Sequence, residues 1–201
     1  MQRNSLTEGL YTIAPVEDFR IFAGFLCSPP DAADRDLEDF LANDAYRHFI
    51  DRIAVTYALV AAEAPQIPLG FATLANDAIV IDRESPLLEV ADYPYTSFPA
   101  VKIGRFGIVL PLQRHRLGGL FIAMLKKLMC EGNRTGCRFI TVDAWRNKKI
   151  GVDVTPFYEK HGFAALPCRE KTSHYSRPGA ALFVGHVHAA PLKRLGGVPI
   201  C

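Results

Sequence analysis

The fold is decided by one stretch of the sequence, Ile108-Val-Leu-Pro-Leu-Gln113-Arg-His-Arg116-Leu-Gly118-Gly119-Leu120. Its apolar residues predict the end of a strand, its basic residues a tight loop, and its two glycines the first turn of a helix. The first turn of a helix carries backbone N–H groups without intrahelical partners and the positive end of the helix dipole. The stretch therefore predicts an anion site, and a pyrophosphate is a group that suits it.

Two common phosphate-binding patterns are absent from the sequence. No Gly-Lys-Ser/Thr follows a glycine-rich loop, so there is no Walker pattern, and the dinucleotide fingerprint G-x-G-x-x-G is also missing. Arg114, His115 and Arg116 add positive charge beside the predicted helix, and arginine can bind phosphate through two N–H groups at once. The simpler alternative is that the glycines only begin a helix and that the basic side chains form a solvated face.

Hydrophobic periodicity predicts a mixed order of helices and strands along the chain. Helical stripes cover 34–53, predicted as one long amphipathic helix, and 118–131, which Gly132 and Asn133 are expected to end. A short helix is predicted over 153–161. Strands are predicted at 10–13, 55–62, 69–75, 79–81, 101–110, 138–144, 163–166 and 180–187. This order favours one α/β or α+β domain with a central sheet.

The connections between these elements set the domain organisation. Two prolines in 64–68 predict a stiff hairpin loop, and the acidic, proline-containing segment 83–99 predicts a long loop without periodicity. No linker is long enough to split the chain. We therefore expect a single domain over 1–188 and a flexible C-terminal tail over 189–201.

Composition excludes several classes of protein. The 201 residues are 49% hydrophobic, which is typical of a globular protein with a core. The 23 Lys and Arg residues nearly balance the 21 Asp and Glu residues, so the net charge of +2 provides no field that would drive nucleic-acid or membrane binding. Five scattered cysteines, without C-x-x-C or zinc spacing, predict reduced thiols, no metal and a cytoplasmic protein. No transmembrane segment or secretory signal is expected.

The loop motif resembles that of a known superfamily. Gln113-x-x-Arg116-x-Gly118 matches the pattern Q/R-x-x-G-x-G/A of the GNAT N-acetyltransferases at all but one position, and Pro156-Phe-Tyr-Glu-Lys-His-Gly-Phe163 is similar to their F-Y-E-K-x-G-F signature. The two motifs occur in the family's order, with a predicted helix and strand between them. The resemblance covers about 57–187. It implies a GNAT-type domain whose mixed, mostly antiparallel sheet is flanked by helices and splayed at the acetyl-CoA site.

The resemblance also implies a role for each matching residue. Tyr158 corresponds to the family tyrosine near the thioester sulfur, so it would act as the general acid that protonates the leaving CoA thiolate after an amine attacks the acetyl carbonyl. The alternative is a core tyrosine with a satisfied hydroxyl. The residues expected to bind acetyl-CoA are Phe106, Ile108, Gln113, Arg114, His115, Arg116, Leu117, Gly118, Gly119 and Asn147.

The sequence departs from the family pattern at two positions. Arg116 replaces the first motif glycine, so the loop must accept a side chain there or follow a different path. The family often has asparagine seven residues before the tyrosine, where this sequence has Gly151, and Asn147 takes that role only with a four-residue insertion. No general base is assigned, because a water relay and several side chains remain open: Glu63, Asp143, His115, Glu159 and His161.

Three hypotheses for the acceptor remain open. The first is the amine of a small molecule or peptide, and the acidic segment 83–99 could line a site for such a cationic group. The second is the amino group of aminoacyl-tRNA, as in a toxin-type GNAT subgroup that the first two thirds of the chain resembles. The third is a non-catalytic module that binds acyl-CoA or a partner. The resemblance to the GNAT family also makes a homodimer an expectation.

The toxin-type resemblance rests on short segments and on basic residues. The segments are Phe25-x-Cys27, Asp36-Leu-Glu-Asp-Phe-Leu41, Thr56-Tyr57, Gly70-Phe-Ala-Thr-Leu74 and Lys102-Ile-Gly-Arg105-Phe-Gly-Ile108. The basic residues that could bind tRNA phosphates are Lys102, Arg105, Arg114, Arg116, Lys126, Lys127, Arg146, Lys148 and Lys149. The alternative for this set is CoA binding together with solvated helix faces.

Overall fold

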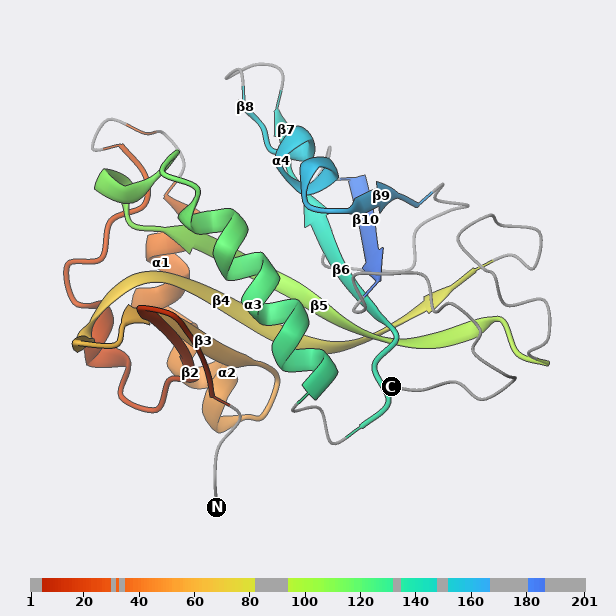
Figure 1. The fold of residues 1–201 in the computed structure, drawn as a ribbon, viewed down its shortest axis with the longest axis horizontal. Coiled ribbons are helices and arrows are strands. Elements are labelled where there is room, and N and C mark those ends of the chain that lie inside the picture. The colour runs from red at the N-terminus through yellow and green to blue at the C-terminus, as the bar shows by residue number, and fades with distance from the viewer. Residues whose placement is uncertain are drawn as a thin grey trace. The chain divides into compact units, whose positions relative to one another are not determined.

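The computed structural model of the chain describes residues 5–29, 32, 35–81, 94–131, 135–147, 152–166 and 181–186. The main sheet has eight strands in the order β1-β2-β3-β4-β5-β6-β10-β9, and it is mostly antiparallel (Figure 1). The predicted α/β class with a mixed, mostly antiparallel sheet and flanking helices is confirmed. The chain divides into two compact units, Met1–Asn76 with Lys102–Leu128 and Asp77–Val101 with Met129–Cys201.

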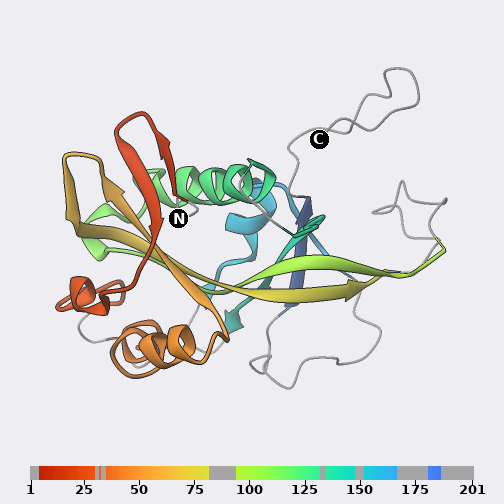
Figure 2. The ribbon, with the colours of Figure 1, turned by 90° about the horizontal axis from the view of Figure 1, so that it is seen from below.

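The first unit contains the N-terminal strands and most of the helices. Its strands are β1 (Leu6–Glu8), β2 (Tyr11–Pro15), β3 (Val55–Ala61) and parts of β4 (Ala64–Val80) and β5 (Ser97–Ile108). Its helices are α1 (Asp36–Asn43), α2 (Ala45–Ile50) and most of α3 (Leu117–Glu131), with short 3-10 turns η1 (Phe19–Phe22) and η2 (Leu110–Leu112). Figure 2 shows α1 and α2 on one face of this part of the sheet and α3 on the other.

Helices on both faces explain why the middle of β4 is apolar without alternation. Five consecutive residues, 70–74, are all buried, as expected for a strand that is covered on each side. Phe71 is fully buried, and its ring lies 5.8 Å from that of Phe22 and 5.7 Å from that of Phe25, measured between centroids. Phe121 of α3 is also fully buried.

The prediction of one long helix over 34–53 is wrong. The structure has two helices, and Asp44 ends α1 and precedes α2. The side-chain amide of Asn43 donates to the backbone carbonyl of Asp39 at 3.0 Å. Because asparagine and aspartate side chains compete for backbone hydrogen bonds, they favour helix ends over helix interiors. The apolar periodicity continues across Asp44, where the structure separates the two helices.

The prediction of a proline loop over 64–68 is also wrong. The turn is only Ala62-Glu63, and β4 begins at Ala64 and includes both Pro65 and Pro68. The register between β3 and β4 shifts at Val60, which pairs with Pro68. The register shifts on both sides of this pair and leaves Pro65 without a partner in β3, and proline, which lacks an N–H, is tolerated at such an irregularity. Residues 79–80 extend this same strand, as predicted.

The predicted loop over 83–99 extends too far at its C-terminal end, because β5 already begins at Ser97. Residues 83–93 of that loop lie outside the described residues. The same holds for Gly132, Asn133, Lys148, Lys149, Gly151 and the tail over 189–201.

The second unit contains the remaining strands and α4. Its elements are β6 (Phe139–Ala144), β7 (Arg146–Asn147), β8 (Val152–Asp153), α4 (Thr155–Lys160), β9 (Phe163–Ala165) and β10 (Ala181–His186). Strand β10 pairs antiparallel with both β6 and β9. Its core includes Ile79, Phe98, Phe139 and Val184. The hairpin β7–β8 was not predicted, because two-residue strands carry no periodic signal. No helix in the described ranges is long and apolar enough to cross a membrane.

Two glycines allow β4 and β5 to approach closely in the first unit. A Cβ atom on Gly70 would lie 2.7 Å from Cδ1 of Ile108 and 2.9 Å from the carbonyl oxygen of Gly107. A Cβ atom on Gly107 would lie 2.8 Å from Cε1 of the Phe71 ring. Both positions need glycine because the core is packed against them.

We expect Gly70→Ala to lower the free energy of unfolding by about 1–3 kcal/mol, because the added methyl group overlaps a fixed backbone oxygen. Urea unfolding measures the change. The matched control is Gly104→Ala on β5, where the nearest atom to an added Cβ is the Thr73 carbonyl oxygen at 3.7 Å. Equal losses in the two variants would contradict the packing explanation.

Candidate functional site

The loop between β5 and α3 contains two arginines in the left-handed backbone conformation. Arg114 has φ = 64° and Arg116 has φ = 65°. This region favours glycine, and another residue there costs about 1–2 kcal/mol. Arg116 stands where the GNAT pattern has its first glycine. The loop thus accepts a side chain at this position and keeps a backbone conformation that suits glycine.

The same loop leads into the N-terminus of α3. The N–H of Leu120 donates to the carbonyl of Arg116 at 3.2 Å, which is an i to i−4 bond of the first helical turn. The N–H groups of Leu117, Gly118 and Gly119 precede it and have no acceptor within the helix. Leu117 is buried and anchors the helix start, while the two glycines are partly exposed. Arg114, His115 and Arg116 are exposed beside these groups, so the loop is a local region of positive charge.

Gln113 and His115 make hydrogen bonds that hold the loop itself. The side-chain nitrogen of Gln113 donates to the carbonyls of Cys27 at 2.6 Å and of Ile108 at 2.9 Å. Nδ1 of His115 lies 2.8 Å from the Gln113 carbonyl, which can only accept, so this nitrogen carries a proton. The amide nitrogen of Gln113 is therefore used within the protein.

The two β5 residues expected at the acetyl-CoA site have packed side chains. The Phe106 ring lies 5.4 Å from that of Phe121, and Ile108 is buried against Gly70. Their side chains connect β5 with α3 and β4. The backbone contact with pantetheine that the resemblance implies for them stays a prediction.

Tyr158 and Asn147 belong to the second unit, and the loop belongs to the first. The start of α4, which carries Tyr158, is fixed by Asp153, whose Oδ1 accepts from the N–H and the hydroxyl of Thr155 at 2.9 and 2.6 Å. These bonds lower the pKa of Asp153. The Nε of Arg146 lies 3.1 Å from the other carboxylate oxygen. Asn147 pairs with Val152 in the hairpin β7–β8.

The side chain of Tyr158 is buried among aromatic rings. The centroid of its ring lies 5.1 Å from that of Phe157 and 5.5 Å from that of Phe163. Gly162, with φ = 77°, follows the end of α4. Burial raises the pKa of Tyr158, so its hydroxyl stays protonated and can donate a proton. Burial also raises the pKa of Tyr57 on β3. A catalytic role for Tyr158 therefore rests on its place in the motif.

The basic residues proposed for tRNA binding fall into several groups. Arg105 and Arg146 each lie beside a carboxylate. The Nε of Arg105 is 3.0 Å from Oδ2 of Asp36 but makes no hydrogen bond, so this contact is an ion pair without a directed N–H. Burial lowers the pKa of Lys126. The exposed members in the described ranges are Arg114, Arg116, Lys127 and Arg146, and Lys102 is partly buried.

The side chains considered as general base differ in exposure. Glu63, Glu159 and His115 are exposed, while Asp143 and His161 are partly buried. The ring of His161 lies 4.8 Å from that of Phe157. The structure singles out none of them.

The thiols have no catalytic environment in the described part of the chain. Cys27 is buried, and burial together with Glu38 raises its pKa to about 12. Cys130 is exposed and Cys137 is partly buried, and neither forms a disulfide; Cys168 and Cys201 lie outside the described residues. Among the described residues, no cluster of histidine, cysteine and carboxylate side chains could hold a metal ion.

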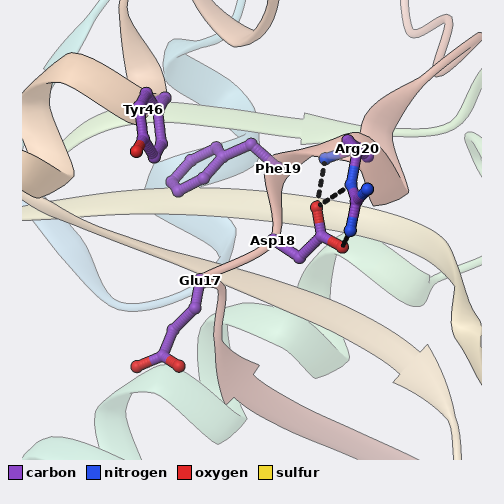
Figure 3. Close-up of a pocket in the computed structure, with 5 residues that line it drawn as sticks. All are labelled: Glu17, Asp18, Phe19, Arg20 and Tyr46. Carbon is purple, nitrogen blue, oxygen red and sulfur yellow. Dashed lines mark hydrogen bonds and ion pairs between the residues drawn. The ribbon is translucent and has the colours of Figure 1, made fainter.

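A separate surface hollow lies in the first unit, and sequence patterns did not indicate it. It is lined by Glu17, Asp18, Phe19, Arg20 and Tyr46 (Figure 3). The carboxylate of Asp18 accepts from the Nε and Nη2 of Arg20 at 2.7 and 2.6 Å, and these hydrogen bonds lower its pKa to about 2. None of the residues of the β5–α3 loop lines this hollow, and its two adjacent charges neutralise each other.

Comparison with solved structures identifies the fold. A tyrosine-to-phenylalanine variant of KacT matches with a TM-score of 0.66 and 21% identity over 89% of this chain and 96% of that one. AtaTR bound with AcCoA matches with a TM-score of 0.56 and 20% identity over 89% and 94%, and AtaT complexed with acetyl-methionyl-tRNAfMet with 0.59 and 21% over 86% and 93%. The chain has a GNAT-like fold. No family model and no curated protein matches the sequence.

The left-handed conformation of Arg116 can be tested by its effect on stability. We expect the free energy of unfolding of Arg116→Gly to exceed that of Arg116→Ala by about 1 kcal/mol. Alanine has a Cβ atom, which is unfavourable in the left-handed conformation, and glycine has none. Both variants remove the same charge, so the difference isolates the backbone. Urea unfolding provides the measurement, and a more stable alanine variant would show that the loop does not adopt this path.

Proposed function

We propose that this protein is an acetyl-CoA-dependent N-acetyltransferase whose acceptor is the amino group of an aminoacyl-tRNA. The observation that carries the proposal is the GNAT-like fold shared over about nine tenths of the chain with AtaT and KacT structures. AtaTR was solved bound with AcCoA, and AtaT with acetyl-methionyl-tRNAfMet. The first unit adds a basic loop before α3, and the second unit adds a buried tyrosine in the second GNAT motif.

The β5–α3 loop fits the pyrophosphate of CoA. Its N–H groups at Leu117, Gly118 and Gly119 lack helical acceptors, and the helix dipole adds partial positive charge at the same end. Arg114, His115 and Arg116 are exposed there and would add charge-assisted hydrogen bonds to phosphate oxygens. Phe106, Ile108 and Asn147 would complete the binding of the pantetheine arm.

Tyr158 would supply the proton that the reaction needs. When bound, acetyl-CoA provides an acetyl group on a thioester, which an amine can attack at the carbonyl carbon. The carbon–sulfur bond breaks, and the hydroxyl of Tyr158 gives its proton to the departing thiolate sulfur. The raised pKa of Tyr158 keeps this proton in place at neutral pH. The attacking amine loses a proton to water or to one of the candidate bases.

A small cationic amine is the second candidate acceptor. Two of the cations expected to face tRNA, Arg105 and Arg146, lie at 3.0 and 3.1 Å from the carboxylates of Asp36 and Asp153. Their charges are therefore partly neutralised, which weakens a phosphate-binding surface. Both acceptors imply a cytoplasmic enzyme, because acetyl-CoA and charged tRNA are found there.

We expect Tyr158→Phe to lower kcat about a hundredfold and to leave CoA affinity nearly unchanged, because the hydroxyl acts only on the leaving thiolate. Release of free thiol from acetyl-CoA measures kcat. Below about pH 10, the wild-type rate should show no loss from ionisation of Tyr158, since its pKa is raised above the ordinary value. The matched control is Tyr57→Phe, which removes another buried hydroxyl and should keep kcat. A full rate in Tyr158→Phe would rule out the general acid.

The acceptor is tested with acetyl-labelled CoA and purified tRNA. We expect label to appear on aminoacyl-tRNA but not on uncharged tRNA or on aminoacyl-tRNA whose amino group is already acetylated. Expression in bacteria should arrest growth, and Tyr158→Phe should relieve the arrest. Label on polyamines or lysine peptides without label on tRNA would support the small-amine acceptor. CoA binding without transfer to any acceptor would support the non-catalytic module.

A further inference from the structure

The β5–α3 loop lies against a segment from the other end of the first unit. The N–H of Leu110 donates to the carbonyl of Leu26 at 2.8 Å, and the side-chain nitrogen of Gln113 donates to the carbonyl of Cys27 at 2.6 Å. The same nitrogen donates to the carbonyl of Ile108, the last residue of β5. Gln113 therefore joins three places: its own loop, the end of β5 and the segment at Cys27.

The opposite side of that segment is held by α1. Oε1 of Glu38 accepts from the N–H groups of Cys27 at 2.9 Å and Ser28 at 2.7 Å, and Oε2 accepts from the Ser28 hydroxyl at 3.0 Å. Partial burial acts to raise the pKa of Glu38, but these hydrogen bonds outweigh it and lower the pKa. The carboxylate is thus ionised at neutral pH, and the segment is bound from α1 through its N–H groups and from Gln113 through a carbonyl.

Helix α1 has a second connection to β5. Asp36, its first residue, lies 3.0 Å from the Nε of Arg105. The Arg105 guanidinium also lies 5.3 Å from the centre of the Phe40 ring of α1. Helix α1, β5 and the loop thus form one connected set of contacts within the first unit.

We propose that Gln113 is a positioning residue that couples the CoA-binding loop to α1 through Cys27 and Glu38, and that its amide group does not contact CoA. The inference rests on the proposed function, because it takes CoA as the ligand of the loop. Binding of CoA then requires the loop path that Gln113 holds, and α1 contributes to CoA affinity from a distance.

The chemistry of the two carbonyls explains which side chains can serve at this position. A carbonyl oxygen only accepts, so its partner must donate, and the glutamine amide nitrogen carries two N–H groups. Arginine is also a donor without acceptor atoms, and it is the other residue that the GNAT pattern admits here. Glutamate has nearly the size of glutamine but offers only acceptors when ionised, so it would repel both carbonyls.

The test is calorimetric titration of the full-length protein with CoA. We expect Gln113→Glu to bind CoA about tenfold more weakly or worse, because two partly buried acceptors lose their donors. Gln113→Arg should retain nearly wild-type affinity. Gln66→Glu, which makes the same change on the exposed part of β4, is the matched control and should bind CoA as the wild type does.

A second pair of variants tests the connection from α1. Glu38→Ala should weaken CoA binding several-fold, whereas Glu38→Gln keeps an acceptor oxygen for the Cys27 and Ser28 N–H groups and should restore it. In the double variant Glu38→Ala with Gln113→Glu, the loss of CoA affinity should be smaller than the product of the two single losses, since both substitutions act on the segment at Cys27. If Gln113→Glu does not fold, the single variants Glu38→Ala and Glu38→Gln decide whether α1 contributes to CoA affinity.

The outcomes separate the two proposals. Titrations are performed well below the unfolding temperature of each variant, where a merely structural role would change the unfolding midpoint but not the Kd for CoA. Wild-type affinity in Gln113→Glu, or equal weakening in Gln113→Arg and Gln113→Glu, would overturn the positioning role. Failure of the wild-type protein itself to bind CoA would instead overturn the proposed function.

Discussion

The rest of the first unit depends on how the chain turns from β5 into α3. Between Ile108 and Leu117 the backbone must leave a sheet, satisfy the last strand carbonyl and start a helix whose first N–H groups stay available. The side chain of Gln113 satisfies the Ile108 carbonyl, and two left-handed arginines complete the turn. A left-handed arginine is unfavourable by about 1–2 kcal/mol, so the surrounding packing must stabilise this path. The hydrogen bonds from the Gln113 side chain to the carbonyls of Cys27 and Ile108 hold part of this path.

The turn also explains how a nearly neutral protein presents a local region of positive charge. The net charge of +2 is spread over many residues, but the loop places three basic side chains beside a helix N-terminus. Elsewhere, arginines are paired: Arg105 with Asp36, Arg146 with Asp153 and Arg20 with Asp18. Pairing reduces the field of these cations, whereas Arg114 and Arg116 are exposed in the loop. The proposed CoA site therefore owes its charge to local placement.

Sequence periodicity failed where a local polar contact or a neighbouring strand overrode it. The apolar stripe over 34–53 divides into two helices at Asp44, next to Asn43, whose side chain bonds the Asp39 carbonyl. Pro65 and Pro68 lie within β4 where its register with β3 shifts, and proline is tolerated at such an irregularity. The first depends on competition between side chain and backbone, and the second on a register that only the paired strands define.

The sequence by itself determined the class of fold, the strand–loop–helix that carries the proposed anion site and the position of Tyr158 in its motif, because these follow from local periodicity, from glycine and from short spacings. Only the tertiary structure decided what Gln113 does. Its partner Cys27 is 86 residues away in the sequence. It likewise decided that Arg116 adopts a glycine-like backbone and that Asp36 partly neutralises Arg105. Such contacts join segments that are distant in the sequence, and residue spacing alone does not predict which segments come into contact.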